Sequence, residues 1–329
     1  MATFATGMLR AGVAAAFLSG VLAPIAGAQV PAGYPSKPVR MIVPYAPGGG
    51  ADVLARVVSL RFGEVFQQPV VVDNRAGGGG LVGSETAVRA TPDGHTLAFV
   101  SGAYTTMAAL RKLPYHPVDD IAPIVMVGEA SSILVVHPSV AAKTTRELID
   151  YARAKPGKLN YGSGGTGGFS HLVTALFDLM AGTRMTHVAY KGTGPALNDL
   201  LGGQLQVIIG STPSTAVHVR SGRLRALGIT SKERSSALPD VPPIAETVPG
   251  YYAPLLYGIW GPKGLPPAIV ELWNREVGKL LQSADMKVRL ASAGVDAVGG
   301  PPSRFRDELR ADVERWRKVV VAADIRVTD

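Results

Sequence analysis

The sequence predicts an α/β protein of two lobes. Apolar runs typical of buried strands alternate with segments of helical periodicity, glycine-rich loops join strands to helices, and the alternation falls into blocks at about 36–135 and 136–250. This alternation favours a mostly parallel sheet in each block, because a helix that follows a strand returns the chain for the next parallel strand. We expect the largely helical remainder, 251–329, to complete the first lobe.

In the first block, a strand, a glycine loop and a helix follow one another. Val39 and the run from Met41 to Val43 form a strand of buried type, and from Ala51 the apolar residues recur with the period of a helix. The succession then repeats. The further elements that we expect are a strand at 70–72, a loop at 76–80, a helix at 81–90 and a strand at 96–100.

The second block has the same order of elements. A strand at 133–136 and a helix at 145–154 precede the densest glycine loop of the chain, 162–168. The elements expected after it are a helix through 172–180, a strand at 186–190, a helix from 195 to 201, strands at 207–209 and 224–229, an irregular proline-rich segment at 238–267, and helices at 267–283 and 302–322.

Composition excludes several classes of protein. With 47% hydrophobic and 18% charged residues, the chain can bury a large core, so wholesale disorder is excluded. The absence of cysteine excludes disulfide scaffolds, cysteine-ligated metals and thiol nucleophiles. The net charge of +8 favours anionic partners, but aromatic residues make up only 6% and no basic run interleaves with them, so we expect no nucleic-acid binding.

The N-terminus has the pattern of a secretory signal peptide. Arg10 precedes an apolar stretch at 11–26, and Ala26-Gly27-Ala28 supplies the small residues that a signal peptidase requires. The apolar stretch is shorter than the roughly 20 residues that a transmembrane helix needs. We expect residues 1–28 to be cleaved and the remaining chain to be exported as a soluble protein.

Two glycine loops, 46–52 and 162–171, each lead from a strand into an amphipathic helix. The first amides of a helix have no carbonyl partner within it and carry a partial positive charge. Glycine lets this backbone approach a ligand closely, so such a loop can hold a phosphate or a carboxylate without a cationic side chain. The alternative for each loop is a tight turn that binds nothing.

Signatures of nucleotide binding and catalysis are weak or absent. Glycines 162, 164 and 167 satisfy G-x-G-x-x-G, as do 78, 80 and 83, but neither set is followed at the required distance by an acidic residue that would hold a ribose. No phosphate-binding lysine loop, nucleophile elbow or H-E-x-x-H motif is present, and the six histidines lack metal-ligand spacing. We therefore expect no cofactor, no metal and no catalysis.

Several side chains beside these loops allow two interpretations. Asp52 can cap its helix or accept a hydrogen bond from a ligand. Ser101 ends a strand, where α/β sheets place binding residues, but it can equally be a turn serine. Lys191 can add charge to an anion site or be solvated, and Tyr45 can form a wall beside the ligand. His171 is expected to make a local hydrogen bond.

These segments resemble the periplasmic solute receptors of tripartite tricarboxylate transporters, also called Bug proteins. The first loop, Val-Pro-Tyr-Ala-Pro-Gly-Gly-Gly-Ala-Asp at 43–52, is similar to the first loop of that family. The resemblance extends over nearly the whole exported chain. Its other motifs lie at 73–77, 92–96, 162–172, 190–192, 202–204 and 238–242.

The resemblance implies a type II periplasmic-binding-protein fold, in which two α/β lobes are joined by two crossings. The lobes would be 36–135 plus 251–329, and 136–250. Both glycine loops would grip a carboxylate of a small organic acid, partly through ordered water. We then expect a monomeric receptor in the periplasm of a Gram-negative bacterium, which delivers its ligand to the membrane subunits of a tripartite tricarboxylate transporter.

The resemblance also assigns ligand contacts position by position. Those of the first lobe are Tyr45, Ala46, Gly49, Ala51, Asp52 and Ser101, and those of the second lobe are Ser163, Gly165, Thr166, Gly168, His171, Tyr190, Lys191, Thr193 and Ser211. His95, Ala189, Gln206 and Pro243 depart from the residues usual in the family. Two alternatives stay open, a carboxylate receptor that feeds a signalling sensor and an enzyme acting on a small acid. The sequence also leaves the acid itself open.

Overall fold

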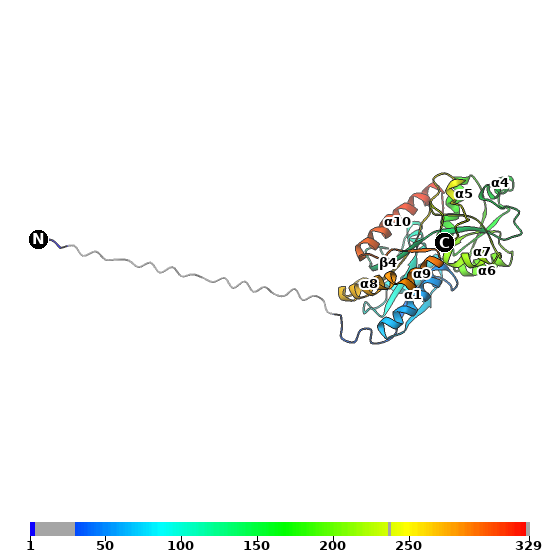
Figure 1. The fold of residues 1–329 in the computed structure, drawn as a ribbon. Helices are drawn as coiled ribbons and strands as arrows, with labels where there is room; N and C mark the ends of the chain where they lie inside the picture. The colour runs from blue at the N-terminus through cyan, green and yellow to red at the C-terminus, as the bar shows by residue number, and fades with distance from the viewer. Residues whose placement is uncertain (4–29, 236–237, 327–329) are drawn as a thin grey trace.

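The computed structural model describes residues 1–3, 30–235 and 238–326 (Figure 1). The predicted signal peptide lies almost entirely outside these ranges. Within them, none of the helices combines the length and apolar character needed to cross a lipid bilayer.

The first lobe is built on a six-stranded sheet with the order β11-β4-β10-β3-β1-β2. Strands β1, β2 and β3 run parallel to one another, and β10 is antiparallel to both β3 and β4. Its strands are β1 (Val39–Val43), β2 (Val70–Asn74), β3 (Thr96–Ser101), β4 (Ile121–Ala130), β10 (Leu255–Pro262) and β11 (Val295–Ala297).

The second lobe has a five-stranded sheet that repeats this plan in the order β7-β6-β8-β5-β9. Strand β6 is parallel to β7 and β8, and β5 is antiparallel to β8 and β9. Its strands are β5 (Ser132–Val136), β6 (Asn160–Ser163), β7 (Thr186–Ala189), β8 (Val207–Ser211) and β9 (Arg225–Ile229).

Each sheet has a point at which the strand order reverses. The chain leaves β1 towards β2 on one side and later returns to place β3 on the other, and β6 stands in the same relation to β7 and β8. The crevice at the carboxyl ends of such strands is where open α/β sheets bind ligands. Both predicted glycine loops begin at this point, one after β1 and one after β6.

Two crossings connect the lobes. The first passes through Ser131, between β4 and β5, and the second follows β9 and leads to β10. The amide of Ser132 donates to the Thr230 hydroxyl and the amide of Thr230 donates to the Ser132 carbonyl, so the two crossings are joined side by side. All of β5 pairs within the second sheet, so the change of sheet occurs at Ser131 rather than at the expected boundary of 135.

Helices cover the faces of both sheets (Figure 1). Their bounds are α1 (Gly50–Phe66), α2 (Leu81–Val88), α3 (Ala103–Leu110), α4 (Thr145–Ala154), α5 (Phe169–Ala181), α6 (Thr193–Leu201), α7 (Thr212–Arg220), α8 (Pro267–Gln282), α9 (Ala284–Ser292) and α10 (Pro302–Ala322), with short 3₁₀ turns at Gly78–Gly80 and Ile244–Glu246.

The C-terminal helix reaches from one lobe to the other. Helix α10 packs on α3 and β4 of the first lobe and also contacts α5 of the second. At that contact the rings of Trp316 and Phe169 meet edge to face, with their centroids 5.5 Å apart. The helical C-terminal region therefore packs on the first sheet, and α10 also packs against the start of α5.

Strand β10 corrects the expectation of an irregular segment at 238–267. All eight of its residues are buried, and it lies between β3 and β4 in the middle of the first sheet. Two glycines and a proline at its end made this run resemble a loop. The long strand β4 and helices α3 and α7 were also absent from the sequence prediction, and α6 begins two residues before Pro195.

Glycine 258 in β10 tests the packing of this central strand. A Cβ at this position would overlap the ring of Phe305, which is itself buried. We expect Gly258→Ala to lower the free energy of unfolding by about 1–3 kcal/mol, because the filled core cannot take the methyl group without strain.

The control for this substitution is Gly278→Ala in α8, where an added Cβ meets nothing within 4 Å. It should leave the free energy of unfolding unchanged or raise it by up to about 1 kcal/mol, since alanine favours a helix over glycine. Urea unfolding measures both. Equal effects of the two substitutions would contradict the packing described for β10.

Candidate ligand-binding site between the lobes

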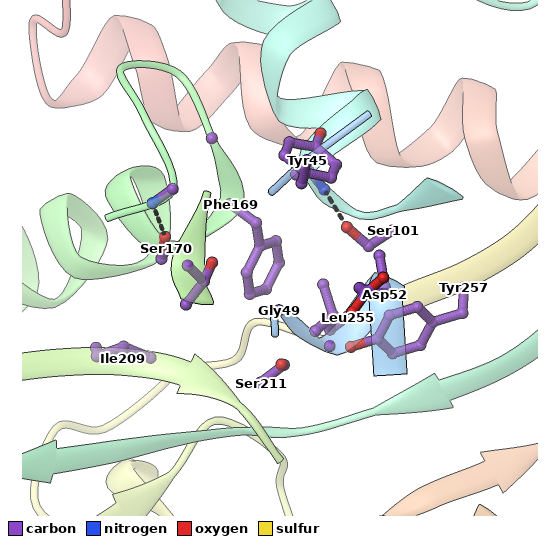
Figure 2. A pocket seen from close by; sticks show the side chains of 16 residues that line it. Tyr45, Gly49, Asp52, Ser101, Phe169, Ser170, Ile209, Ser211, Leu255 and Tyr257 are labelled. Atoms are coloured by element: carbon purple, nitrogen blue, oxygen red, sulfur yellow. Dashed lines mark hydrogen bonds between the residues drawn. The ribbon is translucent and has the colours of Figure 1, made fainter. Parts of the chain in front are cut away.

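The two reversal points face each other across a small, partly open cavity of about 40 Å³ (Figure 2). A buried water needs roughly 10–15 Å³ of such space, so the cavity has room for a few atoms of a ligand or for ordered water. The residues that line it are Tyr45, Gly49, Gly50, Ala51, Asp52, Ser101, Ala103, Gly164, Gly168, Phe169, Ser170, Thr193, Ile209, Ser211, Leu255 and Tyr257.

Main chains from opposite lobes touch above this cavity. The amide of Ala46 donates to the carbonyl of Lys191 over 3.2 Å. Glycine is required at this contact: Gly192 has a φ of +151°, and a Cβ there would lie 2.8 Å from the amide nitrogen of Ala46. A Cβ at Gly194 would overlap the carbonyl oxygen of Pro47. The structure is therefore the closed arrangement of the two lobes.

Several helices begin at the cavity. Helix α1 starts at Gly50, and its first amides have no carbonyl partner within the helix. The starts of α3, α5, α6 and α7 also contribute lining residues. No lysine, arginine or histidine lines the cavity among the residues that the structure describes. Its attraction for an anion therefore comes from helix ends and hydroxyl groups.

The second glycine loop uses most of its amides internally, contrary to the expectation that they face a ligand. Gly164 donates to the Ser170 hydroxyl at 2.9 Å, and Gly165 donates to the Ser163 hydroxyl at 3.2 Å. Gly167 donates to Nδ1 of His171 at 3.1 Å, and Gly168 donates to the carbonyl of Gly165. The amides of this lobe that suit a ligand are instead those at the starts of α5 and α6.

Asp52 braces the first loop. One carboxylate oxygen accepts the amide of Gly48 at 2.9 Å and the other accepts Nε of Arg56 at 3.0 Å. Burial alone would raise the pKa of Asp52, but the hydrogen bonds from Arg56 and Gly48 outweigh it and hold this pKa below its ordinary value. Both oxygens are thus engaged within the lobe; the bond to Gly48 holds the loop, and no side-chain hydrogen bond caps α1.

The cavity wall combines hydroxyl groups with apolar side chains. Phe169, Ile209 and Leu255 supply apolar surface. The hydroxyl of Tyr45 is buried and has no hydrogen-bond partner among the described residues, and burial raises the pKa of this group well above its usual range. A Cβ on Gly80 would lie 2.5 Å from this hydroxyl, so the Tyr45 hydroxyl points toward Gly80 rather than into the cavity, and its ring forms part of the wall.

The structure divides the predicted contact residues into four groups. Ser163 and His171 lie under the second loop, and Ala46 belongs to the contact between the lobes. Gly165, Thr166, Tyr190 and Lys191 line a wider neighbouring hollow of about 550 Å³, together with Gly78, Gly79 and Arg111. The predicted residues that line the inner cavity are Tyr45, Gly49, Ala51, Asp52, Ser101, Gly168, Thr193 and Ser211.

Sequence analysis missed four lining residues outside the glycine loops, namely Ala103, Ile209, Leu255 and Tyr257. Leu255 and Tyr257 belong to β10, which was not predicted as a strand. Tyr257 lies beside Ser211, since a Cβ on Gly50 would overlap both hydroxyl groups. The available signal was the apolar and aromatic run at 255–260. A strand predicted there would have placed these residues at the same sheet edge as Ser101.

Two histidines stack beneath the second loop. The rings of His171 and His187 lie 4.0 Å apart and within 8° of parallel. Burial lowers the pKa of His187 to about 4, and burial together with the neighbouring His187 lowers the pKa of His171 to about 3. Both imidazoles are therefore neutral at pH 7.

Two lobes, paired crossings and a cavity between the lobes at which several helices begin are the features of two-lobed periplasmic binding proteins. A model of the tripartite tricarboxylate transporter family receptor matches residues 54–325. The chain belongs to this receptor family, as the motifs of its sequence predicted.

Similar proteins cover nearly the whole chain. The chain is 37% identical to the UPF0065 protein in the tcbD-tcbE intergenic region of Pseudomonas sp. (strain P51), over 88% of this chain and 87% of that protein. It is 36% identical to Protein BugT of Bordetella pertussis, over 92% and 93% of the two chains.

Solved structures confirm the fold prediction. An R. palustris protein with adipate is 32% identical and superimposes with a TM-score of 0.86, covering 89% of this chain and 99% of that one. The periplasmic binding protein BugD is 29% identical, with the same TM-score and coverage. MatC from Rhodopseudomonas palustris with bound malate is 29% identical, with a TM-score of 0.83 over 87% and 100% of the chains.

Gly194→Ala tests the close approach of the lobes. The added Cβ overlaps Pro47 of the opposite lobe, and the three atoms nearest to it all belong to Pro47 and Gly48 of that lobe. We expect the variant to fold with nearly unchanged stability but to hold the lobes apart, so that its radius of gyration in small-angle X-ray scattering exceeds that of the wild type.

The matched control is Gly202→Ala at the other end of α6, where the nearest atom to a Cβ lies at an ordinary 3.5 Å. This variant should scatter like the wild type. If Gly194→Ala is as compact as Gly202→Ala, the contact between the lobes is not as described.

The histidine stack predicts a loss of stability in acid. Unfolded histidine has a pKa of about 6.5, so between about pH 4 and 6.5 the unfolded chain binds protons that the folded stack does not. Acidification through this window therefore lowers the free energy of unfolding. His187→Gln removes one of the two titrating rings.

Urea unfolding at about pH 7 and about pH 5 measures this difference. The free energy of unfolding should fall more for the wild type than for His187→Gln, a comparison in which other titrating groups cancel. An equal fall in both proteins would show that the stack is not held neutral by the fold.

Proposed function

We propose that the protein is a periplasmic receptor that captures a small organic carboxylate between its lobes and delivers it to the membrane subunits of a tripartite tricarboxylate transporter. The observation that carries the proposal is the convergence of helix starts from both lobes on one cavity that no basic side chain of the described residues lines. A carboxylate has the charge and the acceptor geometry that such amides bind.

The first lobe supplies the most direct contacts. The amides of Gly50 and Ala51 open α1, and Ser101 lines the same cavity. In the second lobe, the Thr193 hydroxyl and the first amides of α5 and α6 complete the site. Asp52 acts as a brace for the first loop, through its bonds to Gly48 and Arg56. Gly165, Thr166, Tyr190 and Lys191 shape the entrance.

The energetics are sufficient for a receptor. A dissociation constant of about 1 μM corresponds to about 8 kcal/mol. Charge-assisted hydrogen bonds contribute roughly 1.5–3 kcal/mol each, so a few of them supply most of this after ordering costs are deducted. Ligand drives closure only through contacts that it makes better in the closed form than in the open one.

The similar proteins support this function and narrow the first ligands to test. Their structures include one with adipate and one with bound malate. The family itself is named for receptors of a tripartite transporter. We also propose that residues 1–28 are cleaved during export and that the receptor acts as a monomer.

A chemical test separates the receptor from an enzyme. A receptor returns its ligand unchanged, so prolonged incubation of adipate or malate with the protein should leave each acid intact in mass spectrometry. Steady conversion of either acid would favour catalysis. A receptor that feeds a signalling sensor instead of a transporter would bind identically, and loss of uptake in a deletion strain separates those two roles.

The central prediction is stabilisation by carboxylates. Thermal unfolding of the purified protein with adipate, malate, citrate and benzoate should show a rise in midpoint with at least one acid, because a ligand that binds only the folded state stabilises it. The matched controls are the neutral amides of the same acids, which keep the size and lose the charge. A panel in which no acid stabilises the protein, or in which the amides match the acids, would refute the proposal.

A further inference from the structure

A histidine that sequence analysis left without a role stands behind the second glycine loop. His187 lies on β7, where it is the register partner of Tyr161 on β6. Its Nε2 is 2.6 Å from the hydroxyl of Ser163, the last residue of β6. His187 does not line the cavity, so any influence that it has on a ligand acts through other groups.

Ser163 connects His187 to the second glycine loop through hydrogen bonds to Gly165. Its hydroxyl is fully buried, accepts the amide of Gly165 and lies at hydrogen-bond distance from the carbonyl of the same residue, both at 3.2 Å. If the Ser163 hydroxyl donates its proton to the carbonyl of Gly165, it can only accept in its contact with His187. A neutral His187 with its proton on Nε2 can donate that hydrogen bond.

The second imidazole completes the brace. His171 stacks on His187, and its Nδ1 accepts the amide of Gly167, which places the proton of the neutral ring on Nε2. The ring of Tyr161 stacks on His187 as well, with centroids 5.0 Å apart. The stacked rings thus control two of the loop amides, one through Ser163 and one directly.

We propose that His187 is a positioning residue for ligand binding, which fixes the second glycine loop through Ser163 and through its stack with His171. The inference rests on the proposed function and extends it to a residue that does not touch the ligand. Since the loop leads directly into α5, a loop held in one conformation presents the first amides of α5 and the Phe169 ring in their binding positions. Pre-organisation of this kind strengthens binding because less ordering is left to the ligand.

Two substitutions at one position separate the hydrogen bond from the ring. His187→Phe keeps a flat ring to stack on His171 and loses the bond to Ser163. His187→Gln loses the ring but carries an amide NH₂ that can donate to the same hydroxyl. We expect His187→Phe to speed hydrogen exchange at the amides of Gly165 and Gly167 about tenfold, and His187→Gln to restore protection at Gly165.

Exchange at Ile209 in β8 serves as the internal reference, because that buried strand reports global unfolding. The exchange rate of the Ile209 amide should be unchanged in His187→Phe if His187 acts only on the second glycine loop. The control is His137→Phe, which removes an exposed histidine–serine pair, His137 Nδ1 to the Ser139 hydroxyl at 2.7 Å, from another part of the second lobe. This control should leave the loop amides protected.

A double-substitution cycle tests the route through Ser163. If His187 acts on Gly165 through this hydroxyl, Ser163→Ala and the Ser163→Ala/His187→Phe pair should give the same exchange at Gly165. Additive effects at Gly165 would overturn the route. Unchanged exchange in His187→Phe, or an equal rise at Ile209, would overturn the positioning role.

Calorimetric titration with adipate gives the functional readout. We expect His187→Phe to weaken binding about tenfold, equivalent to about 1.4 kcal/mol, and His187→Gln to recover much of the loss. Exchange is measured on the ligand-free protein, so the two proposals fail separately. If adipate does not bind the wild type, the choice of ligand is wrong while the exchange result still decides the role of His187.

Discussion

Contact between two main chains across the cleft is the constraint on which the site depends. Where Ala46 meets Lys191 and Gly194 meets Pro47, no side chain separates the lobes. Because the field of a helix end falls off within about one turn, helix starts act together on one ligand only when their backbones come this close. The glycines at this boundary therefore allow close packing of the two main chains, and this packing brings the helix ends near one another. They allow five helices to share a cavity that contains no basic side chain.

The two lobes contribute to this cavity in different ways. In the first, Asp52 ties down the loop through Gly48 and leaves the early amides of α1 available. In the second, serine and histidine side chains consume the glycine amides, so the loop is a rigid support and the helix behind it offers the donors. A similar run of glycines thus produces a binding surface in one lobe and a scaffold in the other.

Features governed by local signals could be predicted from the sequence. The strand, loop and helix from Val39 to Phe66 were predictable because an apolar run, consecutive glycines and a helical period each act over a few residues. Strand β10 was not, because its identity comes from pairing with β3 and β4, more than a hundred residues away in the chain. The same limit applies to the site. Tyr257 and Ile209 reach the cavity through tertiary structure alone, and the internal use of the Gly165 and Gly167 amides depends on the positions of Ser163 and His171.

The position of β10 has a consequence for how the chain assembles. Every strand of the second sheet comes from the contiguous stretch 132–229, whereas the first sheet has a gap in its middle until 255–262 arrives. A protein that emerges amino end first can therefore complete the second lobe while the first still exposes the unpaired edges of β3 and β4. Those edges are open to aggregation during that interval. The late closure of one sheet leaves an interval during synthesis in which the second sheet has all its strands and the first does not.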